Sequence, residues 1–184
     1  MLNSKSNQEP ASGPLKNRFS ASDVLQILRD RHWLTTEPSP EQSAWCERAA
    51  ALLGPQSPGY AGLEGLLSLI FRYDAQEILS TMDAHIVMSR YAARDVLRTL
   101  ANLLLDPVPL NTEHFREIVD ALKTQLDIRG RELFHPLRLA LSGRPGEGEL
   151  DRVVLLLDAA AAARFSVPVK TARDRIIEFC SALD

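Results

Sequence analysis

The sequence predicts an all-α protein that folds as a multi-helix bundle. Of its 184 residues, 45% are hydrophobic and 24% are charged, which is the ordinary range for globular domains and enough to bury a core. From Leu63 to Leu105, and again after Thr112, apolar residues recur at helical spacing. No alternating run of Val, Ile and Thr indicates a strand. We therefore expect one or two compact helical units.

The N-terminal part begins with a tail and two helices. Residues 1 to about 18 are rich in Ser, Asn, Gln, Pro and Lys, a composition that buries too little apolar surface to offset the entropy of ordering. We expect a flexible tail there. Ser20 is placed to cap the first helix, and Pro40 to lie in the first turn of the second. Gly54 and Pro55 should end that second helix.

The remaining elements follow from periodicity and from helix-breaking residues. The stretch from Leu63 to Leu105 predicts helix in two or three pieces, and the Asp-Pro-Val-Pro run at 106–109 breaks it. Three further helices are expected: from the Asn111-Thr112 cap to near Gly130, from Glu147 or Glu149 to about Ala163, and from Val169 to about Leu183. These breaks divide the chain into a tail over 1–18, an N-terminal helical part over 19–106 and a C-terminal helical part over 107–184.

One segment of the C-terminal part, residues 127–150, carries specific information. From Asp127 to Gly143 it reads Asp-Ile-Arg-Gly-Arg-Glu-Leu-Phe-His-Pro-Leu-Arg-Leu-Ala-Leu-Ser-Gly. This stretch resembles the signature of glutamyl-tRNA synthetase C-terminal domains, in which a glycine with flanking basic residues precedes Leu-Phe-x-Pro-Leu-Arg-x-Ala-Leu-Thr-Gly. The matching positions are Ile128, Gly130, Leu133, Phe134, Pro136, Leu137, Arg138, Ala140, Leu141 and Gly143, with Ser142 where the family usually has Thr. The match continues more loosely through Glu149-Leu150 and residues 153–157. We call residues 127–150 the signature segment.

The resemblance implies a fold and a partner. In full synthetases of class I this region forms a helical cage that reads the anticodon, while separate N-terminal domains activate the amino acid. The catalytic signatures of those domains, a His-Ile-Gly-His-like element and a Lys-Met-Ser-Lys-like loop, have no counterpart here. The resemblance therefore implies a non-catalytic anticodon-binding domain with no cofactor. The resemblance extends from about Leu63 to Leu157, and the first 60 residues show nothing specific.

Two departures from the family pattern concern the C-terminus. Asp158 stands where the family usually has a helix-ending glycine, and about 26 residues follow where the family usually ends within one short helix. We expect a remodelled C-terminus and, with it, a changed partner.

Within the signature segment, three residues have a physical role that does not depend on the resemblance. Gly130 can turn the chain after a helix, and Pro136 presets φ in the first turn of a short one. Arg138 is a charged residue in a mostly apolar run. Its five donors suit two tasks, binding carbonyl oxygens at helix ends or contacting RNA phosphates and bases, and both stay open.

Charge is distributed unevenly along the chain. The net charge is −3 and the pI is near 5.8, so the chain lacks the bulk positive charge that holds nucleic acid by counterion release alone. Residues 129–184 nevertheless hold nine Lys and Arg against eight Asp and Glu, compared with twelve against sixteen in residues 1–128. An anion-binding surface should therefore lie in the C-terminal part.

The RNA-binding residues that we predict are the arginines in and around the signature. They are Arg129, Arg131, Arg138 and Arg144, and a wider basic set adds Lys170, Arg173 and Arg175. A second set, Arg90, Arg94 and Arg98, recurs at i, i+4 and i+8. It is either a stripe that tracks a phosphate backbone or a solvated helix face near Asp83 and Asp95.

Other chemistry has little support in the sequence. The four histidines show no His-x-x-x-His spacing, the two cysteines form no Cys-x-x-Cys pair, and the glycine-rich run at 143–148 follows no strand, so we expect no metal site, no disulfide framework and a simple turn. Apolar stretches are too short for a membrane span, and we expect a cytoplasmic protein. The aromatic residues expected in the core are Trp33, Trp45, Phe71, Tyr73 and Tyr91.

Three functions stay open at this point. The first is a module, derived from a synthetase, that binds tRNA or a synthetase through residues 129–144. The second is a helical scaffold that has lost RNA binding and recognises a protein through an apolar groove. The third is an aminoacylating enzyme whose catalytic domains are supplied by another chain. Steep salt dependence of RNA binding favours the first, and a large exposed apolar patch favours the second.

Overall fold

The computed structural model describes residues 17–184, and within that range it contains helices and no strand, as predicted. In chain order the helices are α1 (Ala21–Asp30), α2 (Pro40–Leu53), the 3-10 turn η1 (Gly54–Gln56), α3 (Tyr60–Phe71), α4 (Ala75–Leu79), α5 (Met82–Met88), α6 (Ala93–Leu103), α7 (Thr112–Leu126), α8 (Arg131–Ser142), α9 (Gly148–Ala163) and α10 (Ala172–Leu183).

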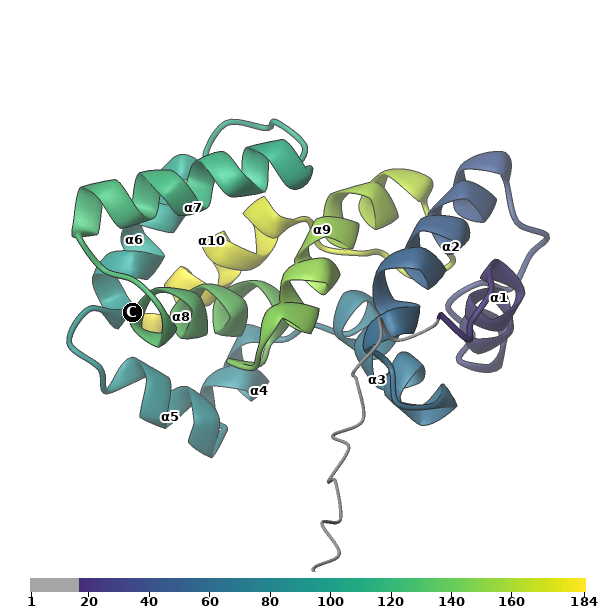
Figure 1. The fold of residues 1–184 in the computed structure, drawn as a ribbon, viewed down its shortest axis with the longest axis horizontal. Coiled ribbons are helices and arrows are strands. Elements are labelled where there is room, and N and C mark those ends of the chain that lie inside the picture. The colour runs from purple at the N-terminus through teal and green to yellow at the C-terminus, as the bar shows by residue number, and fades with distance from the viewer. Residues whose placement is uncertain (1–16) are drawn as a thin grey trace, which may run out of the picture.

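Helix α9 lies between two groups of helices (Figure 1). On one side it packs against α2 and α3, and α1 packs on the outside of α2; we call α1–α3 the aromatic lobe. On the other side it packs against α8, which belongs with α4–α7 and α10 in what we call the signature lobe. The predicted boundary at residue 106 falls between α6 and α7. Helices from the two sides of that boundary pack together, since α10 contacts both α4 and α6.

Several helices begin where the sequence predicts, because a polar side chain satisfies their first amide groups. Ser20 and Ser39 each form a capping box at the start of α1 and α2, and Asn111 accepts a hydrogen bond from the backbone N–H of His114 in α7. Helix α10 begins three residues later than predicted, because Thr171 is its N-cap. Leu53 ends α2 as expected.

The stretch from Leu63 to Leu105 forms four helices rather than two or three. Asp74 and Thr81 cap new helices with their side chains, which interrupts a periodicity that is continuous in the sequence. Helix α7 also ends earlier than predicted, at Leu126, where Asp127 adopts a left-handed φ of 51°. Gly130, at φ 59°, is then the N-cap of α8.

Two predictions about single residues need correction. Pro136 does not lie in the first turn of a helix: α8 begins at Arg131, so this proline lies in the second turn. Tyr91 is 99% exposed and is not part of the core. Trp33, Trp45 and Phe71 are buried as expected, and Tyr73 is half-buried against the core.

Of the predicted tail, residues 1–16 lie outside the described part of the chain. Asn17, which was assigned to that tail, is held in place because its Nδ2 donates to the carbonyl oxygen of Ala50 at 3.1 Å. Among the helices of residues 17–184, none combines the length and the apolar character that crossing a bilayer requires.

Helix α10 fills the interior of the signature lobe and is fixed there by one buried arginine. The side chain of Arg175 is fully buried and donates to the carbonyl oxygens of Leu69, Ile70 and Leu141, at 2.8, 2.6 and 2.9 Å. These carbonyls end α3 and α8, so a single guanidinium satisfies the unpaired acceptors of two helix ends. It also lies 4.5 Å from the ring centroid of Tyr73. Burial lowers the pKa of Arg175 to about 10, so it is charged at neutral pH.

Candidate nucleic-acid interface

Arg138, in the middle of α8, is held by a bidentate ion pair. Its Nε and Nη2 donate to the two carboxylate oxygens of Asp151 in α9, at 2.8 and 2.9 Å, and its Nη1 donates to the carbonyl oxygen of Gly146 at 2.9 Å. The guanidinium carbon lies 4.7 Å from the ring centroid of Phe134, and only 8% of the residue is exposed. Its donors therefore face the protein, and they bind a carboxylate and a loop carbonyl rather than the helix-end carbonyls that the sequence analysis considered.

These bonds fix the loop that joins α8 to α9. Gly143 ends α8 with φ 88°, and the hydroxyl of Ser142 donates to the carbonyl oxygens of Arg138, at 2.7 Å, and of Arg144, at 3.3 Å. Because Arg138 holds the same loop at Gly146, the glycine-rich run is a turn with a defined shape, as predicted. Arg144 lies on this loop and is exposed.

Arg129 and Arg131 lie at the opposite end of α8, and both are exposed. In the same place, Nη1 of Arg90 is 2.9 Å from Nδ1 of His135 and donates to the carbonyl oxygen of Arg131 at 3.4 Å. Burial lowers the pKa of His135, and the positive charges of Arg90 and Arg131 lower it further. The imidazole is therefore neutral at pH 7, so that its Nδ1 can accept a hydrogen bond from Arg90.

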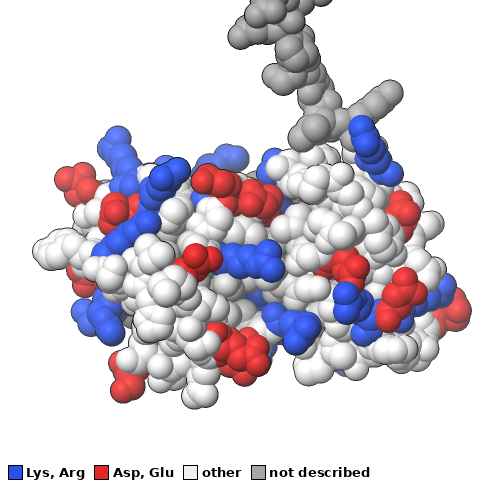
Figure 2. Space-filling model, turned by 90° about the horizontal axis from the view of Figure 1, so that it is seen from below, with Lys and Arg blue, Asp and Glu red and all other residues white. Residues whose placement is uncertain are grey.

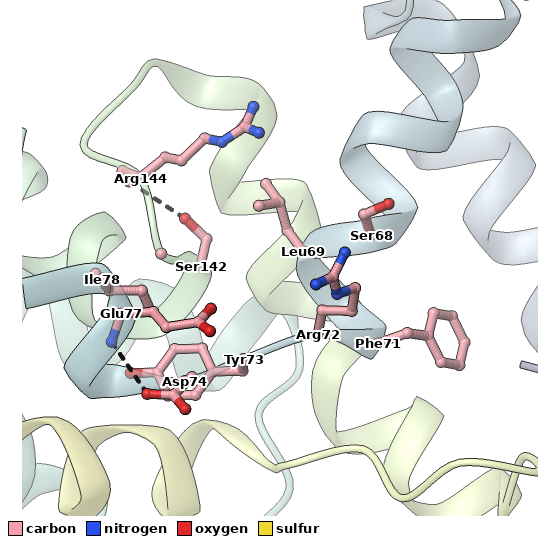
Figure 3. Close-up of a pocket in the computed structure, with 11 residues that line it drawn as sticks. Ser68, Leu69, Phe71, Arg72, Tyr73, Asp74, Glu77, Ile78, Ser142 and Arg144 are labelled. Atoms are coloured by element: carbon pink, nitrogen blue, oxygen red, sulfur yellow. Dashed lines mark hydrogen bonds between the residues drawn. The ribbon is translucent and has the colours of Figure 1, made fainter. Parts of the chain in front are cut away.

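Arg144 borders a pocket of about 590 Å³ that the sequence did not reveal. Figure 3 shows Arg144 entering it from the loop after α8 and Arg72 from the end of α3. Asp74 and Glu77 also line the pocket, but Asp74 already accepts hydrogen bonds from the first amides of α4. Arg72 was missed because it lies 72 residues from Arg144 in the sequence, and only the packing of the chain brings the two together.

The structure does not join the four predicted arginines into one cluster. The twelve residues of α8 span roughly 18 Å. Arg129 and Arg131 lie at its start, Arg144 lies beyond its end, and Arg138 is buried between them. The exposed arginines therefore form two groups, one at each end of α8.

The side chains of the wider basic set mostly bind other groups of the protein. Arg175 is buried, Lys170 forms an ion pair with Glu178 at 2.5 Å, and Arg173 donates to the carbonyl oxygen of Leu105. The stripe of Arg90, Arg94 and Arg98 is also broken, because Arg90 precedes α6 and reaches towards α8. Arg98 lies 3.8 Å from Asp95, which fits the solvated helix face considered above.

The surface has no large region of a single sign on the face shown in Figure 2, where basic and acidic side chains are interspersed. Within residues 17–184, no three His, Cys, Asp or Glu side chains lie close enough together to hold a metal ion. The features that stand out are thus the exposed arginines at the two ends of α8 and the signature segment that positions them.

An all-helical chain with this signature and these exposed arginines has the features of an RNA-recognition domain of a synthetase. The family described as "Anticodon binding domain" matches residues 21–161, and the chain belongs to this family. The match extends further towards the N-terminus than the resemblance visible in the sequence, and it ends before α10.

Known relatives are glutamate-tRNA ligases. Glutamate-tRNA ligase 2 of Syntrophus aciditrophicus is 26% identical over 116 residues, which are 63% of this chain and 23% of the relative. Glutamate-tRNA ligase of Bacillus velezensis is 26% identical over 141 residues, or 77% of this chain and 29% of the relative. That of Bacillus subtilis is 25% identical over 134 residues, or 73% and 27%. The chain thus spans less than a third of the length of these relatives. No solved structure matches it.

Proposed function

We propose that this chain is a cytoplasmic, non-catalytic module that binds tRNA through the two ends of α8. The observation that carries the proposal is the position of Arg129, Arg131 and Arg144. These guanidiniums are exposed, and no carboxylate of residues 17–184 forms an ion pair with them. Cations that are not neutralised by the protein are available to phosphates, and arginine also stacks on unpaired bases.

Family membership supports tRNA as the ligand, since the relatives of the chain are glutamate-tRNA ligases. Arg72 extends the proposed surface, because it shares a pocket with Arg144. Arg138 acts indirectly: it holds the loop at Gly146 and so positions Arg144.

The proposal is tested by measuring the affinity of the protein for labelled tRNA-Glu and for an unrelated tRNA, at low and at physiological salt. Two double variants remove the proposed contacts at one end of α8 each: Arg129→Ala with Arg131→Ala, and Arg72→Ala with Arg144→Ala. Each should weaken binding of tRNA-Glu, because phosphate contacts and the release of counterions are lost.

A matched control removes the same charge elsewhere. Arg29 and Arg48 are exposed on α1 and α2 in the aromatic lobe, and changing both to Ala should leave the affinity close to that of the unchanged protein. Equal weakening by all three double variants would show that only net charge matters. Absence of tRNA binding by the unchanged protein at low salt would refute the proposal.

A second candidate, a protein-interaction scaffold, is favoured by one observation. Met82 and Ile86, one turn apart on α5, are 74% and 52% exposed. Their side chains therefore form an apolar ridge on the outside of the signature lobe. A protein-interaction scaffold becomes the better-supported function if the unchanged protein binds neither tRNA at low salt.

A further inference from the structure

Tyr91 is an aromatic side chain with no packing role. It lies in the turn between α5 and α6 and is 99% exposed, whereas Trp33, Trp45 and Phe71 are buried. Exposing a whole aromatic ring to water forgoes the free energy that its burial would contribute. Both faces of the ring are therefore available to a ligand.

The turn that carries Tyr91 is well fixed. The backbone N–H of Arg90 donates to the carbonyl oxygen of Val87 at 3.1 Å, and that of Ala93 donates to the carbonyl oxygen of Arg90 at 3.3 Å. On the C-terminal side of Tyr91, Ala92 and Ala93 are buried. The ring therefore projects from a fixed corner, which reduces the entropy lost when a ligand stacks on it.

This corner is joined to the start of α8. The side chain of Arg90, the neighbour of Tyr91, lies 2.9 Å from Nδ1 of His135 and donates to the carbonyl oxygen of Arg131. The turn that carries Tyr91 is thus tied through Arg90 to the first turn of α8, where Arg131 is exposed and which Arg129 precedes.

Positive charge exceeds negative charge around this corner. Helices α5 and α6, the turn between them and residues 127–132 carry five basic residues, Arg90, Arg94, Arg98, Arg129 and Arg131, and four acidic ones, Asp83, Asp95, Asp127 and Glu132. Asp95 lies 3.8 Å from Arg98, which offsets part of its charge. An exposed ring beside unpaired guanidiniums is the combination with which proteins hold single-stranded nucleic acid.

We propose that Tyr91 is a stacking platform for an unpaired base of the bound RNA, while Arg129 and Arg131 contact the phosphates that flank that base. The inference rests on the proposed function, and it adds the contact that distinguishes a loop from a duplex. In a duplex the bases are already stacked on each other, so the ring has nothing to bind.

The test compares Tyr91→Ala, Tyr91→Leu and Tyr91→Phe with the unchanged protein, using a labelled anticodon stem-loop of tRNA-Glu. Loss of one stacked base by substitution with alanine weakens binding by about fivefold or more. Tyr91→Ala and Tyr91→Leu should both show this loss, because leucine keeps the bulk and removes the ring. Tyr91→Phe should bind within about twofold of the unchanged protein, since its ring stacks equally well.

Two further measurements distinguish loss of stacking from a change in charge or in stability. The salt dependence of binding should be the same for Tyr91→Ala and the unchanged protein, because no charge is removed. The midpoint of thermal unfolding should not change, because the ring is exposed.

The outcomes separate this inference from the proposed function. If the unchanged protein binds the stem-loop and Tyr91→Ala binds equally well, the stacking platform is refuted and RNA binding stands. Binding of Tyr91→Leu at the unchanged affinity would also refute it, because an aliphatic side chain would then suffice. If the unchanged protein binds no RNA, the proposed function itself fails, and this inference with it.

Discussion

Arg138 illustrates how a residue of a recognition signature can act without touching the ligand. Four of its contacts are with the protein: both oxygens of Asp151, the carbonyl oxygen of Gly146 and the ring of Phe134. Such a bidentate pair depends on the planar fork of the guanidinium. The residue type is therefore required for the shape of the loop that carries Arg144.

Arg138→Lys should lower the free energy of unfolding by about 1–3 kcal/mol, because an ammonium group cannot satisfy both oxygens of Asp151 and the carbonyl at once. Urea unfolding followed by circular dichroism measures this change. Arg48→Lys, on the exposed face of α2, is the control and should change stability by less than about 0.5 kcal/mol. Equal stability of the two variants would mean that the buried pair contributes nothing.

At this scale, the sequence identifies the arginines of the signature but not the groups around them, and RNA contact by these arginines stays a prediction. It left two roles open for Arg138, because the carboxylate that decides between them lies thirteen residues away on another helix. Arg72 was not recognised, since it reaches Arg144 only through tertiary packing. Tyr91 was placed in the core because the helical periodicity runs through a turn at residues 89–92, which breaks the helix.

At the scale of elements, the two departures from the family pattern, Asp158 and the additional C-terminal residues, are connected by hydrogen bonds. Asp158 stands where a helix-ending glycine was expected, and α9 continues past it to Ala163. Its carboxylate accepts from the backbone N–H of Leu110 at 2.7 Å and from that of Ala172 at 2.9 Å. The aspartate therefore attaches both the loop before α7 and the first residue of α10, which lies beyond the family match.

Asp158→Asn should weaken the attachment of α10. An amide group has one acceptor oxygen, so its NH₂ would face one of the two backbone donors, and the free energy of unfolding should fall by about 1–3 kcal/mol. Hydrogen exchange should show faster exchange of the α10 amides than in the unchanged protein. The control is Asp120→Asn, because Asp120 is an exposed residue 3.9 Å from Lys123. Unaltered protection of α10 in Asp158→Asn would contradict this role.

Helix positions were largely predictable because caps and proline act locally. Capping by Ser20, Ser39 and Asn111 is decided within four residues, and those starts were confirmed. The boundaries between the four helices from Leu63 to Leu105 were not predicted. Asp74 and Thr81 can lie inside a helix as well as cap one, and only the folded chain shows that they are caps. The start of α8 was also misplaced, because Gly130 is the N-cap of that helix and α7 has already ended at Leu126.

At the scale of the whole molecule, the charge distribution limits how RNA can be held. The net charge is −3, and opposite charges are mixed on the face shown in Figure 2. Long-range attraction of the whole molecule for RNA is therefore weak. The proposed binding of tRNA would therefore depend on the few exposed arginines at the ends of α8.

The salt dependence of tRNA binding should accordingly be modest. Three or four phosphate contacts give a slope of log K against log salt between roughly −2 and −3. The double change of Arg129 and Arg131 to Ala should reduce the magnitude of the slope by roughly one to two, and the control double change of Arg29 and Arg48 should not. Affinities measured over a series of salt concentrations give these slopes. A slope near zero would contradict phosphate contacts.

Both tryptophans of the chain lie in the aromatic lobe or next to it. Trp33 stacks on Phe71 with 4.8 Å between ring centroids, and Trp45 contacts Phe71 and Phe165 and donates from Nε1 to the carbonyl oxygen of Leu156. The signature lobe, α4–α8 and α10, contains no tryptophan. Intrinsic fluorescence is therefore an optical probe of this aromatic cluster: because Phe71 also lines the pocket of Arg72 and Arg144, a ligand that enters this pocket should alter the emission more than one bound at Arg129 and Arg131.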